Sequence, residues 1–381
     1  MPEDREPQEA PETVDGAEME EAARRLGPRN PVLRFLGQNR GVTALLAVVI
    51  LGALFTPQRG VNGPYLVNVI TGHAEPLRDS DGTWNPPRFL TTKIHSDVLY
   101  EYAEYGLLAV GMTLVILTAG IDLSVGSVLG IAAVTFAYLL IARGTPPAVA
   151  IAGAAGMGTL CGLINGFLVS KLHLQPFVAT LAMMVAARGG AKVISGGYKI
   201  QAGGADWYWV QGDLPEFMTW MVSPSYGGFL RPVTLLFIVS LLVMVVVVKY
   251  TRFGRYLYAV GGNEEAARLS GVPVTGTKIL AYSLCGFFAG LAGFCNACRT
   301  GLGNPEAGTT FELDAISAVV IGGTSLAGGR GAMILTLLGA LIVGYIDKAL
   351  SVNNVDVAYR LLAKGLIIVI AVVIQSRRRT N

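Results

Sequence analysis

Long apolar stretches separated by short polar ones run through most of the 381-residue chain. A helix needs about 20 mostly apolar residues to cross the hydrocarbon of a bilayer, so each such stretch predicts one membrane-spanning helix. Ten stretches meet this description, at residues 41–56, 98–119, 124–142, 147–169, 177–197, 232–248, 278–298, 314–327, 331–350 and 358–375. The first and the eighth are short, and the eighth is rich in glycine, so we expect a broken or re-entrant segment there. The pattern predicts an all-α polytopic membrane protein with about ten transmembrane helices.

The residue composition agrees with a membrane protein and excludes a soluble one. Apolar residues make up 52% of the chain and charged residues only 14%, whereas soluble domains carry about 25% charged residues. The 48 glycines lie inside apolar stretches and form no repeat, which excludes a collagen-like chain and favours closely packed transmembrane helices. Glycines at four-residue spacing predict three helix–helix contacts, at Gly158, Gly162 and Gly166, at Gly126 and Gly130, and at Gly286 and Gly290.

Basic residues gather in three segments of the chain. They precede the first apolar stretch (residues 24–40), fill the loop 249–278, and follow the last stretch (residues 377–379). With ten spans, all three segments lie on the same side of the membrane. Because Lys and Arg accumulate in cytoplasmic loops, we expect both termini in the cytoplasm.

This topology divides the chain into three regions. Residues 1–35 form a cytoplasmic tail, acidic and then basic, and its first 23 residues hold nine acids and one base. Such a segment buries too little apolar surface to fold, so we expect it to be disordered. Residues 36–376 form the transmembrane domain, with extracytoplasmic loops at 57–97 and 198–231, and residues 377–381 form a basic cytoplasmic tail. Tryptophans in the second loop indicate an aromatic belt at the interface or, alternatively, a docking face for a soluble partner.

The chain lacks the sequence signatures of enzymes. No G-x-x-x-x-G-K-[ST] loop is present, and the nearest segment, 323–330, lacks the lysine and the hydroxyl that follow. Neither G-x-S-x-G nor H-E-x-x-H occurs, and the three histidines lie far apart in the sequence. Cys295 and Cys298 have C-x-x-C spacing without a second pair, which favours small core residues. We therefore expect no catalytic residues, no ATP hydrolysis and no metal site in this chain.

Residues 259–273 predict a short helix that faces the cytoplasm. Asn263 is a favourable N-cap, and Glu264 and Glu265 lie at the positive end of the helix dipole. Gly271 can adopt the left-handed conformation that ends a helix, and Pro273 prevents its continuation. A helix of about two turns is marginal by itself, so another surface must hold it. Two interpretations stay open: the helix lies on the protein's own cytoplasmic face, or it inserts into a cytoplasmic partner.

Two glycine-rich segments, 120–126 and 322–331, interrupt or follow apolar stretches. Non-helical backbone is tolerated at membrane depth only against protein or a water-filled cavity. Asp122 is costly in hydrocarbon. Its carboxylate either caps the helix that begins near Ser124 or belongs to a gate on the translocation path. The residues assigned to this gate or path are Gly120, Asp122, Ser124, Gly126, Gly322, Gly323, Thr324 and Ser325.

Three further polar residues lie inside apolar stretches. Arg188 and Lys192 are one helical turn apart, and we expect both side chains to snorkel toward the membrane surface. Pairing with an intramembrane acid such as Asp122 is the alternative. Asn165 lies among the glycines of its stretch and favours a hydrogen bond between helices over a contact with solute.

Four blocks of sequence resemble the signature of ribose-type sugar permeases of ATP-binding cassette (ABC) importers. They are AVGMTLVILTAGIDLSVGS at 109–127, GFLVSKLHLQPF at 166–177, YAVGGNEEAARLSG at 258–271 and ELDAISAVVIGGTSLAGGRG at 312–331. The blocks occur in family order, and the resemblance covers roughly residues 98–375.

The resemblance implies a multi-pass permease of the bacterial inner membrane, with residues 36–376 as its permease domain and 249–278 as its cytoplasmic coupling loop. The implied partners are cytoplasmic ATP-binding subunits, an extracytoplasmic sugar-binding protein and a second permease copy or paralogue, with no nucleic acid. ATP and Mg²⁺ would bind the ATPase, and this chain would hold no cofactor. By the same similarity, the coupling helix that contacts the ATPase comprises Asn263, Glu264, Glu265, Ala266, Ala267, Arg268, Leu269, Ser270 and Gly271.

The solute implied by the resemblance is a monosaccharide such as ribose, xylose or galactose. An amino acid or a nucleoside carried by the same machinery is an alternative. A secondary transporter is a third reading, which requires acidic residues in broken helices at the membrane midplane. Asp122 is the one good candidate for such a residue.

Overall fold

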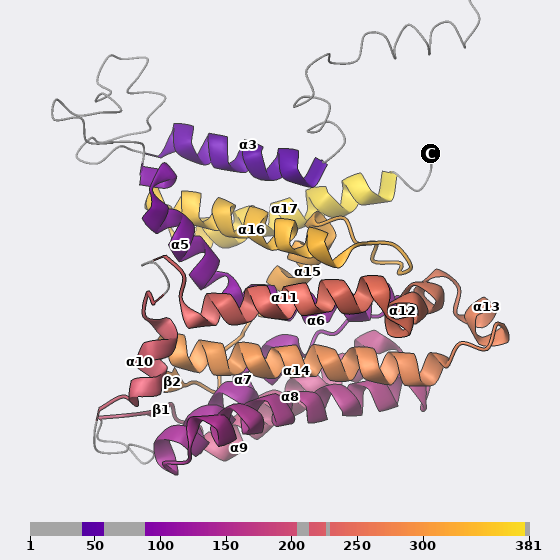
Figure 1. The fold of residues 1–381 in the computed structure, drawn as a ribbon, viewed down its shortest axis with the longest axis horizontal. Coiled ribbons are helices and arrows are strands. Elements are labelled where there is room, and N and C mark those ends of the chain that lie inside the picture. The colour runs from indigo at the N-terminus through magenta and orange to yellow at the C-terminus, as the bar shows by residue number, and fades with distance from the viewer. Residues whose placement is uncertain (1–39, 57–87, 204–212, 226–228, 378–381) are drawn as a thin grey trace, which may run out of the picture.

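The computed structural model of the chain describes residues 40–56, 88–203, 213–225 and 229–377. Within these ranges the protein is almost entirely helical, and Figure 1 shows the long helices lying side by side in one bundle. The α-helices are α3 (Arg40–Phe55), α5 (Thr92–Glu101), α6 (Ala103–Leu117), α7 (Val125–Ala137), α8 (Pro147–Ser170), α9 (Pro176–Ser195), α10 (Glu216–Val222), α11 (Pro232–Tyr250), α12 (Arg252–Gly262), α13 (Glu264–Leu269), α14 (Val274–Thr300), α15 (Phe311–Ile321), α16 (Met333–Val352) and α17 (Val357–Arg377).

Four shorter elements complete the described fold. A 3₁₀ turn, η1 (Arg88–Leu90), precedes α5, and a π-helical turn, η2 (Tyr138–Ala142), extends α7. Strands β1 (Ile200–Gln201) and β2 (Leu302–Gly303) form one antiparallel pair. The two strands lie at one end of the bundle, and α12 and α13 lie at the opposite end, where α17 also ends (Figure 1).

Each of the ten predicted apolar stretches coincides with helix, and six helices in the described residues are long and apolar enough to cross a membrane. The stretch 98–119 is divided at Tyr102 into α5 and α6. Helix α15 has only 11 residues and ends at Ile321, so the eighth stretch is broken, as expected. The helical, multi-span class is therefore confirmed.

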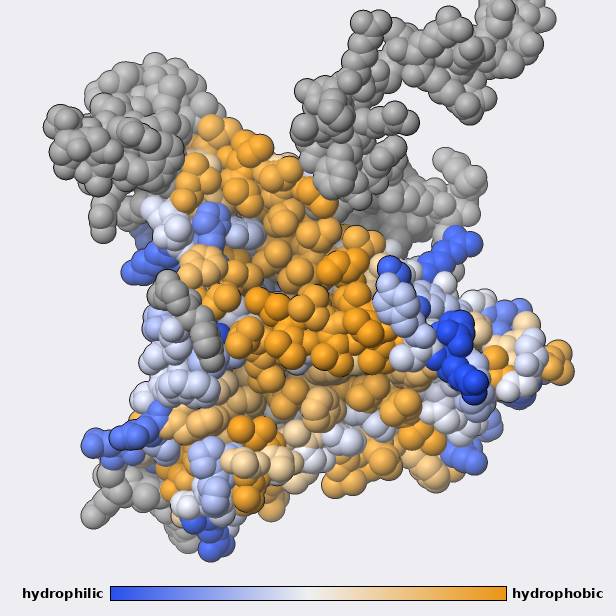
Figure 2. All heavy atoms as spheres, in the orientation of Figure 1, coloured by the Kyte–Doolittle hydropathy of each residue, from blue (hydrophilic) through white to orange (hydrophobic). Residues whose placement is uncertain are grey.

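Helices α6, α7 and α14 form the centre of the bundle. Every residue of α6 except Tyr105 is buried, and all four cysteines of the chain are buried and unpaired, as expected for core residues. The peripheral helices α8, α9 and α11 expose large apolar side chains outward. Figure 2 shows a broad apolar surface over α3, α16 and α11, with hydrophilic residues gathered toward the two ends of the bundle. This distribution suits a body surrounded by lipid.

Glycines bring α8 and α14 into direct contact. A Cβ at Gly158 or Gly162 would collide with the backbone of α14, and a Cβ at Gly286 or Gly290 would approach the backbone of α8 too closely. Gly166 faces the backbone of Ile279 in the same way. Two of the predicted glycine contacts are thus confirmed as one shared interface.

The third predicted glycine contact, at Gly126 and Gly130, is wrong as a helix–helix contact. Both glycines lie on α7, but a Cβ on them would meet the carbonyl oxygens of Gly308 and Ala307. Those residues belong to the non-helical stretch between β2 and α15, residues 304–310, which consists of turns and is here called the turn segment. The small residues make room for a non-helical backbone, which the four-residue spacing alone does not distinguish from a helix.

The described parts of the predicted loops contain regular secondary structure. The loop 57–97 ends earlier, because α5 begins at Thr92, while residues 57–87 lie outside the described residues. The loop 198–231 contains β1 and α10. The loop 249–278 contains α12 in addition to the expected short helix. Both predicted tails lie outside the described residues, apart from Arg377.

Candidate functional site

The short helix predicted around residue 264 is present as α13. The side chain of Asn263 caps it, because its Oδ1 accepts a hydrogen bond from the backbone N–H of Ala266 at 2.9 Å. Gly271 has a φ of +80°, the left-handed conformation expected after the helix end. Pro273 immediately precedes α14. The local sequence signals therefore set both ends of α13.

One face of α13 packs on the protein and the other is open. Ala267 is buried against Val260 of α12 and Val274 of α14. Lys278 of α14 donates to Glu264 at 2.6 Å, which fixes the helix further. Leu269 is 81% exposed, and Figure 1 shows α13 projecting from the end of the bundle. An exposed leucine on a projecting helix is available to a partner.

Asp122 lies in the first break, residues 118–124, between α6 and α7. Its Oδ1 accepts hydrogen bonds from the backbone N–H and the hydroxyl of Ser124, at 2.9 and 2.6 Å. The Asn165 amide on α8 donates to the Ser124 hydroxyl at 2.9 Å and to Asp122 at 3.4 Å. All three side chains are buried. The carboxylate thus stabilises the start of α7, and the expected hydrogen bond from Asn165 between helices is confirmed.

Of the other predicted gate residues, Gly120 lies in the first break and Gly126 in the first turn of α7. Gly322, Gly323, Thr324 and Ser325 lie in the second break, residues 322–332, between α15 and α16. Gly322 follows α15, Gly323 has a φ of +95°, and Thr324 is buried. The backbone N–H of Ser325 donates to the carbonyl oxygen of Arg330 at 2.9 Å, which closes this loop on itself.

The structure brings the two breaks together. The backbone N–H of Gly329 donates to the carbonyl oxygen of Leu117, the last residue of α6, at 3.1 Å. A Cβ on Gly328 would lie 2.7 Å from the backbone nitrogen of Ala119. Two segments separated by about half the chain therefore form one contact region beside α12.

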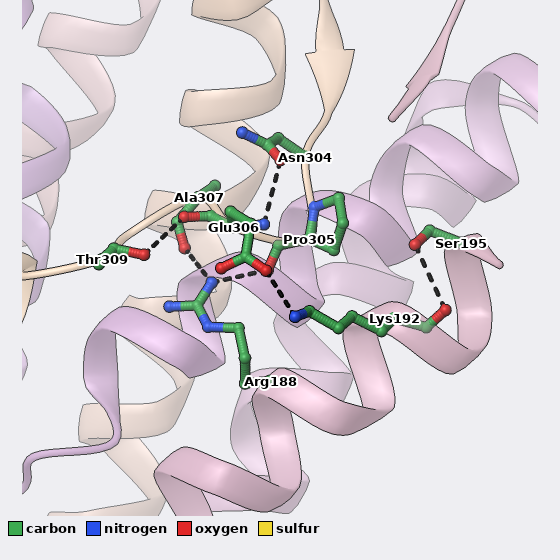
Figure 3. Close-up of polar contacts among 8 residues, drawn as sticks. All are labelled: Arg188, Lys192, Ser195, Asn304, Pro305, Glu306, Ala307 and Thr309. Atoms are coloured by element: carbon green, nitrogen blue, oxygen red, sulfur yellow. Dashed lines mark hydrogen bonds and ion pairs between the residues drawn. The ribbon is translucent and has the colours of Figure 1, made fainter. Parts of the chain in front are cut away.

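Arg188 and Lys192 on α9 hold the turn segment (Figure 3). The Arg188 guanidinium donates to the carbonyl oxygens of Pro305 and Ala307 at 2.6 and 2.8 Å. Lys192 pairs with Glu306 at 2.7 Å. The expectation that the side chain snorkels outward is wrong for Arg188, whereas the Lys192 side chain is 52% exposed, as snorkelling requires. Neither residue pairs with Asp122 among the described contacts. Carbonyl groups freed from helical bonding need donors inside a membrane protein, and a guanidinium supplies several.

The turn segment also contacts the start of α7. A Cβ on Gly126 would meet the carbonyl oxygen of Gly308 in that segment and the carboxylate of Glu312 on α15, so the turn segment lies directly against the first turn of α7. Glu306 itself is exposed at the segment's surface, and its hydrogen bond with Lys192 holds the pKa of its carboxyl below the usual range.

Sequence reasoning missed Tyr258 on α12. Its hydroxyl donates to the carbonyl oxygen of Gly331 in the second break at 2.9 Å. Partial burial raises the pKa of this hydroxyl above its usual value. The available signal was the spacing of Leu257, Val260 and Gly261, which repeats on one face of a helix and indicates an amphipathic α12.

Comparison with known proteins defines the class. The family described as "Branched-chain amino acid transport system / permease component" matches residues 94–372, more than two thirds of the chain. The chain belongs to this family. It is a multi-pass membrane permease of the ABC type, the transport subunit rather than the ATPase.

Individual relatives are permeases for sugars. The chain is 40% identical to the ribose import permease protein RbsC of Escherichia coli (strain K12) over 293 residues, 77% of this chain and 88% of the relative. It is 38% identical to the fructose import permease protein FrcC of Rhizobium meliloti over 284 residues, 73% of this chain and 76% of the relative. It is 34% identical to the xylose transport system permease protein XylH of E. coli (strain K12) over 342 aligned residues, 76% of this chain and 86% of the relative.

Proposed function

We propose that this chain is the permease subunit of an ATP-driven importer for a monosaccharide of the ribose, xylose or galactose kind. The observation that carries the proposal is the 40% identity to a ribose import permease along most of both chains. Relatives named for fructose, galactofuranose and xylose support the same solute class. The family description, which names branched-chain amino acids, keeps another small polar solute as the second candidate.

The proposed topology has ten crossings in the bacterial inner membrane, with both termini in the cytoplasm. Helices at all ten apolar stretches support the count. The end of α17 on the same side of the bundle as α12 and α13 supports placing the C-terminus with the basic loop (Figure 1). Basic residues in that loop, such as Arg252 and Arg255, favour the cytoplasmic side.

The proposed coupling helix is α13, with its flanking residues Asn263, Ser270 and Gly271. It would seat in a groove of a cytoplasmic ATP-binding subunit, which carries the ATP and Mg²⁺. The capped ends, the exposed Leu269 and the position at the tip of the bundle support this role. An extracytoplasmic sugar-binding protein and a second permease copy or paralogue would complete the importer.

The proposed gate comprises the two breaks. Their direct contact with each other, and the contact of Gly126 with the turn segment, support a single moving region. Asp122 within this region acts on the start of α7 through Ser124. A change in the first break would therefore move α7 as well.

Uptake measurements in cells test the proposed solute class. Cells that lack this chain should lose high-affinity uptake of one labelled monosaccharide, and the wild-type gene should restore it. An excess of unlabelled ribose, xylose or galactose should compete, whereas leucine and adenosine should not. Restored uptake of leucine or adenosine instead would show that the solute class is wrong.

A further inference from the structure

Helix α12 runs directly into the coupling helix. It ends at Gly262, and the next residue, Asn263, caps α13. On the buried face of α12, Leu257 packs into the core of the bundle, while Val260 packs against Ala267 of α13 and Val274 of α14. Any displacement of α13 by a partner therefore acts on α12 as well as on α14, which contacts Ala267 and Glu264.

The last turns of α12 meet the second break without intervening side chains. A Cβ on Gly261 would overlap the carbonyl oxygen of Leu117 and lie 2.6 Å from the backbone nitrogen of Gly329. A Cβ on Gly329 would lie 2.7 Å from the Cα of Gly262. Three backbones, from α6, α12 and the second break, are thus in direct contact. Backbones packed this closely cannot slide past one another without separating.

A side-chain hydrogen bond links α12 to the second break. The Tyr258 hydroxyl reaches across to the carbonyl oxygen of Gly331 at 2.9 Å. Gly331 lies just before α16, while the other end of the same break is attached to α15. Since Gly329 also holds the end of α6, the break can pass a displacement both to α15 and to the first break.

We propose that Tyr258 is a positioning residue that makes the second break follow α12, so that movement of the coupling helix reaches both breaks. The proposal rests on the proposed function, because it requires α13 to engage an ATPase. Tyr258 acts through the carbonyl group of Gly331.

Tyr258→Phe tests the proposal, because it removes the hydroxyl and keeps the ring. The matched control is Tyr256→Phe on the same helix, whose hydroxyl forms no hydrogen bond with any residue that the structure describes. Each variant is reconstituted in vesicles with its ATPase and the sugar-binding protein, and sugar uptake and ATP hydrolysis are measured in the same samples.

We expect Tyr258→Phe to lower the sugar transported per ATP hydrolysed by about three- to tenfold, the effect of losing one hydrogen bond in the coupled state. Subunit assembly and the thermal melting temperature should match wild type, and the control should keep the wild-type ratio. The proposed role of Tyr258 would be refuted if Tyr258→Phe left the ratio of sugar transported to ATP hydrolysed unchanged, or if Tyr256→Phe lowered this ratio equally. Failure of the wild-type importer to couple uptake to ATP would instead refute the proposed function.

Discussion

Removal of the Asn263 side chain should weaken the attachment of the ATPase. The helix α13 has six residues, so few internal hydrogen bonds support it. The bond from the Ala266 N–H to Asn263 is one of them. Replacing an N-cap by Ala costs about 1 kcal/mol, within a range of about 0.5–2. If the partner binds only the formed helix, about 1 kcal/mol corresponds to a roughly fivefold weaker affinity.

The assay is a titration of the permease in nanodiscs with the purified ATP-binding subunit, which gives a Kd for each variant. Asn263→Ala should raise the Kd by about fivefold. Asn263→Ser is the matched control, because Ser is an equally good N-cap, and it should bind as wild type does. A wild-type Kd for Asn263→Ala, or equal losses for the Ala and Ser variants, would refute the reasoning.

Three other predictions concern the gate, the ion pair between Lys192 and Glu306, and the topology. Asp122→Ala should reduce uptake in an assembled importer, and normal uptake would exclude a role in the gate. Reversing the charge of Lys192 or Glu306 alone should lower the melting temperature slightly, and the double swap should restore it. Because the hydrogen bond with Lys192 lowers the pKa of Glu306, the ion pair is lost only when the pH falls through that lowered pKa. The melting temperature should therefore not vary between about pH 6 and 8 on account of this pair. A cysteine at Asp213 should react with an impermeant thiol reagent from outside, and a cysteine at Glu264 should not. Labelling of Glu264→Cys from outside would show that the proposed orientation is inverted.

Local sequence signals predict much of this protein well. The apolar stretches locate all ten predicted helical segments, and the cap residues Asn263 and Gly271 locate both ends of α13. These features depend on neighbours within a few residues. The glycine contact between α8 and α14 was also predictable from the sequence, because small residues at four-residue spacing lie on one face of a helix and let a second helix approach closely.

Long-range contacts were not predictable in this way. The partner of Arg188 is Pro305, 117 residues away in the sequence. Nothing in the sequence around Gly126 indicates that its neighbour is the turn segment rather than a helix. The contact of the second break with α6 likewise depends on how α15 and α16 place that loop. Such contacts arise from packing of the whole bundle, which periodicity along one segment does not encode.

The most direct test of the central claim is ATP-driven transport by the purified components. The permease is reconstituted in sealed vesicles with its ATPase and its sugar-binding protein, and labelled ribose, xylose and galactose are tested separately. One of the sugars should accumulate against its gradient only when ATP and the binding protein are both present. Accumulation driven by a sodium or proton gradient without ATP would contradict the account, as would ATP-driven accumulation of an amino acid but of no sugar.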